Sequence, residues 1–136
     1  MAHQPTFYSD GSWPRKTDTF HVLLMKFWGA VSDSYGSPSP VSFATDRLIL
    51  LRLSNAFSTV DAGAWNGTIK DTKHVLLKKI AYALEDILPS SAVPTDQSTN
   101  RELLRSMARS FGLTPGYRDT EWKILYDITV YINGTV

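Results

Sequence analysis

The sequence predicts an all-α protein with five amphipathic helices, arranged as a five-helix bundle or as a short solenoid of single-helix repeats about 26 residues long. Three observations predict it. An apolar stripe with helical spacing occurs five times, a residue pair suited to helix capping opens each copy, and proline or glycine separates the copies.

The repeat is clearest in the first and third copies. The run Asp18-Thr19-Phe20-His21-Val22-Leu23-Leu24-Met25-Lys26 is matched 53 residues later by Asp71-Thr72-Lys73-His74-Val75-Leu76-Leu77-Lys78-Lys79. Further copies start at 44, 98 and 119, so the spacings along the chain are 26, 27, 27 and 21 residues.

In every copy, apolar residues stand five, six, nine and thirteen places after the start, a spacing that places them on one face of a helix. The stripe residues are Leu23, Leu24, Phe27 and Val31; Ile49, Leu50, Leu53 and Phe57; Leu76, Leu77, Ile80 and Leu84; Leu103, Leu104, Met107 and Phe111; and Ile124, Leu125, Ile128 and Ile132.

The stripes predict helices over 18–32, 45–59, 71–88, 99–112 and 119–132. The first follows Trp13-Pro14 and is weakened by an internal Gly29, and Gly112 follows Phe111 at the end of the fourth, as expected of a helix C-terminal glycine. The fifth is ambiguous, because residues 127–132 are rich in the β-branched and aromatic types that prefer strands. The repeat favours a helix there, and we adopt that reading.

Each predicted helix starts at a residue whose side-chain oxygen can accept a hydrogen bond from a free backbone N–H of the first turn. Thr99 with Glu102 also has the spacing of a capping box. The predicted N-caps, uncertain by one residue within each Asp-Thr pair, are Asp18, Thr45, Asp71, Thr99 and Asp119.

The direction of the helices is left open. Linkers of about ten residues can return along a helix, which allows parallel stacking, and an alternating bundle is the other possibility. The shorter linker before residue 119 predicts an antiparallel arrangement of the last two helices.

The chain divides into an extended N-terminal arm, residues 1–17, and a five-repeat helical domain, residues 18–136. The arm carries Phe7, Tyr8 and Trp13 among turn-forming residues and does not match the repeat. It either folds across its own helices or docks on a neighbouring molecule, and the residues do not decide between these.

Composition excludes several classes of function. The 136 residues include no cysteine, so disulfides, thiol catalysis and thiolate metal sites are ruled out. The net charge of +1 gives no strong field for nucleic acid or anionic lipid, and we expect neither as a partner. No apolar run of about 18 residues and no signal peptide is visible, so we expect no membrane partner.

The search for catalytic chemistry finds no constellation, so we predict that the protein is not an enzyme and has no cofactor. No phosphate-binding glycine loop and no nucleophile motif occurs. Asp18 with His21, and Asp71 with His74, have the spacing of two metal ligands, but nothing supplies a third and fourth. We therefore expect no metal site.

Partner contacts are the remaining candidates. Arg101, Arg105 and Arg109 share one helix face, and Trp65 stands in a linker. A solubilising face is the ordinary explanation of the arginines. The alternative is a stand-alone helical module that binds nucleic acid or an acidic partner through an Arg/Lys face. With Phe7, Tyr8 and Trp13, these are the residues expected to contact a partner.

The pattern D-T-x-x-x-L-L-x-K-I-x-x-A-L after a turn with proline or glycine resembles short helical repeats in tail- or fibre-associated proteins of bacteriophage virions. Ser12-Trp13-Pro14-Arg15 and Gly116-Tyr117-Arg118 precede two of the copies, and the fourth copy departs at Ser98 and Ser106. The resemblance implies a structural or adaptor protein, made in the host cytoplasm and present in several copies in the virion. Its implied partners are portal, tail or fibre proteins and copies of itself, and it implies no catalytic residues.

Overall fold

The computed structural model describes residues 13–35, 45–60, 63–90 and 93–134. These residues form five α-helices and no strand: α1 (Phe20–Tyr35), α2 (Asp46–Val60), α3 (Lys73–Ile87), α4 (Asn100–Ser110) and α5 (Glu121–Gly134). The all-α prediction is confirmed, and the fifth segment is a helix despite its strand-forming residues. Phe7 and Tyr8 lie outside the described residues.

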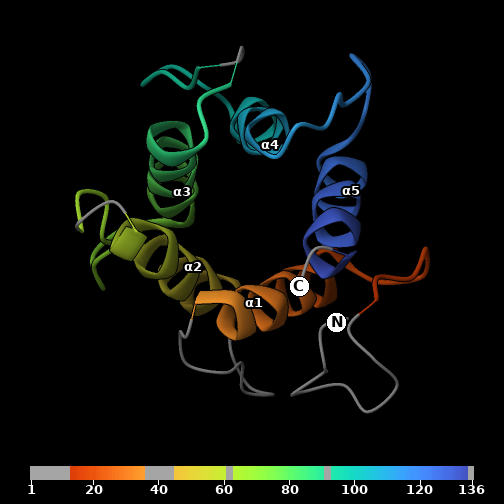
Figure 1. The fold of residues 1–136 in the computed structure, drawn as a ribbon, viewed down its shortest axis with the longest axis horizontal. Helices are drawn as coiled ribbons and strands as arrows, with labels where there is room; N and C mark the ends of the chain where they lie inside the picture. Colours follow the sequence, from red (N-terminus) through yellow and green to blue (C-terminus); the bar gives the residue numbers. More distant parts are fainter. Residues whose placement is uncertain (1–12, 36–44, 61–62, 91–92, 135–136) are drawn as a thin grey trace.

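The five helices form a closed ring (Figure 1). Each packs on the helix before it and the helix after it in the chain, and α5 returns to pack on α1. Within the described ranges no other pair of helices approaches this closely along the backbone. Each helix therefore needs an apolar face wide enough to cover two neighbours.

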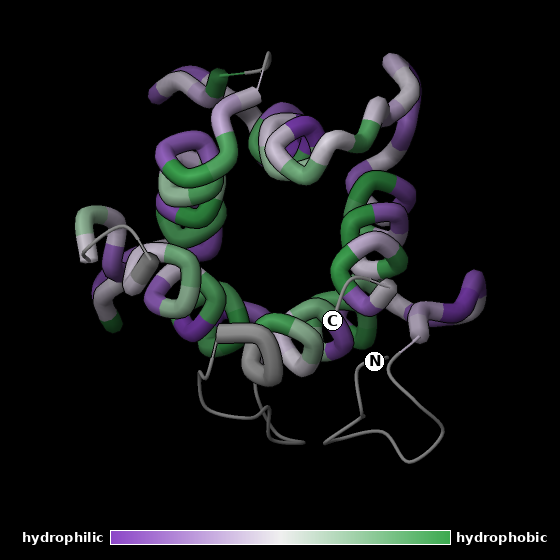
Figure 2. Tube along the Cα trace, viewed as in Figure 1, coloured by the Kyte–Doolittle hydropathy of each residue, from purple (hydrophilic) through white to green (hydrophobic). Residues whose placement is uncertain are grey.

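All twenty stripe positions supply that face, and none is more than 7% exposed. The first position of the stripe, Leu23 in α1 and its counterparts in the other four helices, is completely buried in every case. Full burial of one such side chain contributes about 1.5–3 kcal/mol. In Figure 2 hydrophobic residues recur along all five helices, and hydrophilic residues lie both on the helices and in the connecting segments.

The helices run parallel, because their starts meet at one end of the ring. Arg47, the second residue of α2, donates from Nε to the backbone oxygen of Asp71, just before α3, at 2.8 Å. Arg101 of α4 donates in the same way to Asp119 at 2.6 Å. Trp122 of α5 donates from Nε1 to the oxygen of Asp18 at 2.7 Å, which closes the ring.

The predicted antiparallel pairing of the last two helices is wrong. Their starts meet through Arg101, and their ends meet through the rings of Phe111 and Tyr131, whose centroids are 5.5 Å apart. The reason is the length of α4, which has only 11 residues and spans about 16 Å. A linker over residues 111–120 reaches about 33 Å when extended, which is enough to return to the first end.

Threonine caps every helix. The hydroxyl oxygen accepts from the backbone N–H three residues later at 3.1–3.2 Å, and the caps are Thr19, Thr45, Thr72, Thr99 and Thr120. Thr99 and Glu102 also form the complete predicted capping box. The predicted caps Thr45 and Thr99 are therefore confirmed, and Asp18, Asp71 and Asp119 are each one residue early.

Those three aspartates close the turn that leads into the helix. Each carboxylate accepts from the backbone N–H three residues earlier, at 2.8–2.9 Å: Asp18 from Arg15, Asp71 from Thr68, and Asp119 from Gly116. Ser98 does the same before α4, accepting from Thr95. The carboxylate satisfies the turn, which leaves the threonine free to cap the helix.

The loop between α2 and α3 passes very close to both helices at Gly67. Its backbone N–H donates to Asn55 Oδ1 at 2.9 Å. A Cβ atom at this residue would lie 2.5 Å from Ser54 Oγ and 2.6 Å from Leu76 Cδ2. The loop therefore requires glycine here.

Gly67→Ala should destabilise the protein by about 1–3 kcal/mol, because the added methyl group must displace well-packed atoms. Urea denaturation would measure it. Gly134→Ala is the matched control, since the nearest atom to its added Cβ is 3.7 Å away, an ordinary contact. Equal stability of the two variants would contradict the close approach.

Trp122→Phe should lower the free energy of unfolding by about 1 kcal/mol, because the ring-closing hydrogen bond to the Asp18 carbonyl is lost while most of the aromatic packing is kept. Hydrogen exchange should show faster opening of α1 and α5 than of α3. If the extra exchange is spread evenly over all five helices, the hydrogen bond does not stabilise the contact between α5 and α1 in particular.

Candidate functional site

A cavity of about 200 Å³ lies at the centre of the ring and is lined by all five helices. The side chains that line it stand at equivalent places, one from the start, one from the second turn and one from the third turn of nearly every helix. Because the helices are parallel, these side chains form successive layers along one axis.

The second layer is a ring of five leucines, one from each helix and all buried: Leu24, Leu50, Leu77, Leu104 and Leu125. The third layer, deeper in the cavity, consists of Phe27, Leu53, Ile80 and Met107. The walls below the first layer thus carry no polar side-chain atom.

Aromatic rings pack together at the third layer and beyond it. Phe57 of α2 lies 6.0 Å from Phe27 of α1 and 6.3 Å from Phe111, which directly follows α4, measured between ring centroids. Since α2 and α4 are not neighbours in the ring, the last contact crosses its interior. These three phenylalanines, the aromatic plug, are all at most 7% exposed.

The opposite end is a rim formed by the first residue of each helix: Phe20, Asp46, Lys73, Asn100 and Glu121. It is mixed in charge, with two carboxylates, one ammonium and one amide. The rim is the one part of the lining that can bond a polar group.

Two histidines link rim residues to the preceding helix. His21 Nδ1 lies 2.5 Å from Asp46 Oδ1, and His74 Nδ1 lies 2.6 Å from Asn100 Oδ1. These contacts join α1 to α2 and α3 to α4. The same place in α2, α4 and α5 is taken by the donors Arg47, Arg101 and Trp122, which join the remaining pairs.

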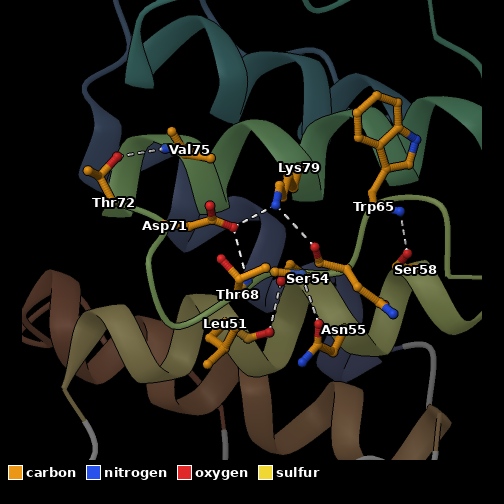
Figure 3. A network of polar contacts seen from close by, with 12 residues as sticks. Leu51, Ser54, Asn55, Ser58, Trp65, Thr68, Asp71, Thr72, Val75 and Lys79 are labelled. Atoms are coloured by element: carbon orange, nitrogen blue, oxygen red, sulfur yellow. Dashed lines mark hydrogen bonds and ion pairs between the residues drawn. The ribbon is translucent and has the colours of Figure 1, made fainter.

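Two lysines occupy equivalent places outside the cavity and hold the turns. Lys26, only 4% exposed, donates to Asp18 at 2.8 Å and to the Trp13 carbonyl at 2.9 Å. Lys79 donates to Asp71 at 2.6 Å and to the Asn66 carbonyl at 3.1 Å (Figure 3). Each lysine thus ties the segment that approaches a helix to that helix.

The acidity of Asp71 reflects this contact. The hydrogen bond from Lys79, followed by that from the Thr68 backbone N–H, lowers the pKa of Asp71 below its ordinary value of 3.8. The charged carboxylate therefore contributes to stability at neutral pH.

The residues predicted to contact a partner are partly engaged within the chain. Trp65 stacks on Tyr82 at 4.7 Å and donates from Nε1 to Asp86 at 2.7 Å. Arg101 also donates to the Tyr117 carbonyl, and Arg105 donates to the Gly116 carbonyl at 2.8 Å.

Arg109 lies in the last turn of α4 and is half-buried. Trp13 is 53% exposed, and its ring lies close to Gly134 at the end of α5. The structure does not bring the tryptophans and arginines together into one face. That each of them contacts a partner stays a prediction.

No group of three or more histidine, aspartate or glutamate side chains in the described ranges is placed to hold a metal ion. In particular, His21 and His74 bond to Asp46 and Asn100 on neighbouring helices. None of the helices in the described part of the chain is long and apolar enough to cross a membrane.

The sequence interpretation missed the cavity. The signal that could have found it is the identity of one stripe position, six places after the start, which is leucine in all five copies. The other stripe positions vary among aliphatic, aromatic and methionine side chains. A constant residue at one position is expected where equivalent side chains meet around an axis.

Comparisons of the chain with protein-family models, with curated proteins and with solved structures find no match.

Asp71→Asn should lower the free energy of unfolding at neutral pH, because it removes the charged partner of Lys79. The difference from wild type should shrink as the pH falls through the lowered pKa of Asp71, since the wild-type carboxylate is then protonated too. Urea midpoints at neutral pH and at about pH 3 would show it.

Asp96→Asn is the matched control for this pH dependence. Its side chain is 83% exposed and lies 3.8 Å from Lys78, so it should have little effect at either pH. A pH-independent effect of Asp71→Asn would show that the charge on Asp71 does not stabilise the turn.

Proposed function

We propose that the protein is a non-enzymatic structural or adaptor component of a bacteriophage virion, a multi-copy connector or tail- or fibre-attachment protein. It would contact portal, tail or fibre proteins and copies of itself. The observation that supports this proposal is an exposed large apolar side chain on each of the four described segments that lead into a helix.

These four side chains are Trp13 before α1, Ile69 before α3, Val93 before α4 and Tyr117 before α5, with exposed fractions of 53%, 78%, 62% and 85%. Ile69 and Tyr117 occupy the same place, two residues before the aspartate that closes the turn. Two more exposed large apolar side chains among the described residues, Leu88 and Tyr131, lie near the far ends of α3 and α5.

Turn positions ordinarily carry polar residues, and the core of this protein is complete without these side chains. The segments that carry them lie around the outside of the ring (Figure 1). Exposed side chains on separate segments suit several separate contacts with a surrounding assembly better than one continuous patch. Aromatic residues are also enriched in protein interfaces. The net charge of +1 favours short-range apolar contacts over electrostatic attraction.

We also propose that the five helices are copies of one single-helix unit and that the arm, residues 1–17, contributes Phe7, Tyr8 and Trp13 to the contacts. The support is that residues at the same place in different copies make the same hydrogen bonds, as the threonine caps and the turn-closing aspartates do.

A non-enzymatic role is supported by the state of the polar side chains. The lysines, aspartates and histidines that the sequence places at repeated positions cap, close or cross-link elements of the fold. The binding of nucleic acid through an arginine face is not favoured, because Arg101 and Arg105 donate to backbone carbonyls of the turn before α5.

The proposal predicts that the chain is found in purified virions and binds at least one portal, tail or fibre protein of the same phage. Mass spectrometry of virions and binding assays with the purified proteins would test this. A chain that stays monomeric in native mass spectrometry and binds none of these proteins would refute it.

Replacing both exposed turn residues, Ile69→Ser with Tyr117→Ser, should weaken that binding about tenfold, because apolar contact area is lost. Lys16→Ser is the matched control, since Lys16 has the same place in the turn before α1 and should leave the affinity within about twofold. If the control weakens binding as much as the double variant, the contact is not made by the apolar turn residues.

A further inference from the structure

We infer that the central cavity is a binding site for one small, uncharged, apolar molecule of about eight non-hydrogen atoms, which enters through the polar rim. Its volume is about 200 Å³. An engineered protein cavity of about 150 Å³ with leucine, isoleucine and phenylalanine walls binds benzene, which has six such atoms. In proportion, this cavity accepts a slightly larger molecule, such as a six-carbon alcohol or a substituted benzene.

The composition of the walls selects an apolar ligand over water. Below the rim, the lining comprises the leucine ring and the third layer, with Phe27 and Met107 as its largest members. A water molecule in a protein interior normally makes two to four hydrogen bonds, and these side chains offer none. An apolar molecule would make dispersion contacts with the same walls, with no lost hydrogen bonds.

The architecture keeps the cavity open. Each helix is held between two neighbours, so a helix cannot move inward to fill the space without losing contacts on both sides. The aromatic plug supports the deep end, where Phe57 and Phe111 meet across the ring. A preformed apolar site of this kind binds without first paying for a conformational change.

The rim favours an uncharged ligand. Asp46, Glu121 and Lys73 present both signs of charge around one opening, so neither a carboxylate nor an ammonium group is preferred. Asp46 is already bonded to His21, and Asn100 to His74. A single hydroxyl group at the end of the ligand can still hydrogen-bond at this level, while its hydrocarbon part lies among the leucines.

The test titrates benzene and n-hexanol into the purified full chain and follows the leucine methyl groups by NMR. We expect saturable shifts concentrated on the five leucines of the second layer. The midpoint of thermal unfolding should rise by roughly 4 °C at a ligand concentration about tenfold above Kd. Hexanoate and hexylammonium, the charged comparators, should bind at least about tenfold more weakly than n-hexanol.

Leu104→Phe adds a ring to the wall and should abolish the shifts or weaken binding at least about tenfold. Leu48→Phe is the matched control, because Leu48 of α2 is partly buried against the core and does not line the cavity. It should bind as wild type does. Absence of saturable shifts in the wild type, or equal binding by Leu104→Phe and wild type, would overturn the proposal.

Leu50→Ala tests the same site in the opposite direction and does not depend on Leu104→Phe folding. The substitution enlarges the cavity, so preference should move from benzene to n-butylbenzene by several-fold relative to wild type. An unchanged preference would place the ligand elsewhere and overturn the assignment. These measurements use this chain alone, without any portal, tail or fibre protein, so their outcome is independent of the adaptor role.

Discussion

The contact of α5 with α1 is the constraint on which the rest of the structure depends. Every helix carries an apolar face that extends to two neighbours, and only a closed ring supplies two neighbours to all five helices. An open row would leave one side of α1 and one side of α5 in water. The hydrogen bond from Trp122 to the Asp18 carbonyl joins segments 104 residues apart in sequence. The loop-closure entropy of that join is offset by the apolar surface that it covers.

Parallel direction follows from the connecting segments. The described segments run along the outside of the ring (Figure 1). The segments before α1 and α3 are fastened to the helix that they lead into, through Lys26 and Lys79 and the carbonyls of Trp13 and Asn66. The segment before α5 is fastened to the preceding helix, where Arg105 donates to the Gly116 carbonyl. The conspicuous charged residues of the repeat are therefore part of the scaffold. This leaves two features for function: the exposed apolar residues on the outer segments, and the cavity that five parallel faces enclose.

Much of the fold could be read from local patterns. A stripe at helical spacing predicts both a helix and its buried face, and α5 shows this well. Its β-branched residues favour a strand locally, but Ile124, Ile128 and Ile132 lie on one face, and are buried together, only if the segment is a helix. The caps were predictable to within one residue. Asp and Thr are both good caps. The threonine is the cap because the aspartate accepts a hydrogen bond from the backbone N–H three residues earlier, in the turn that precedes the helix.

The sequence by itself determined that there are five helices, where they begin to within about two residues, and that the twenty stripe side chains are buried, because helix periodicity and capping are properties of neighbouring residues. Only the tertiary structure decided that the helices are parallel, that the ring closes, and that equivalent leucines meet around an axis. These depend on how far each linker returns and on how many faces surround the centre. Five faces leave a space at the level of the leucines, whereas Phe57 and Phe111 fill it below. Such a balance of volumes belongs to the assembled ring, and no single segment encodes it.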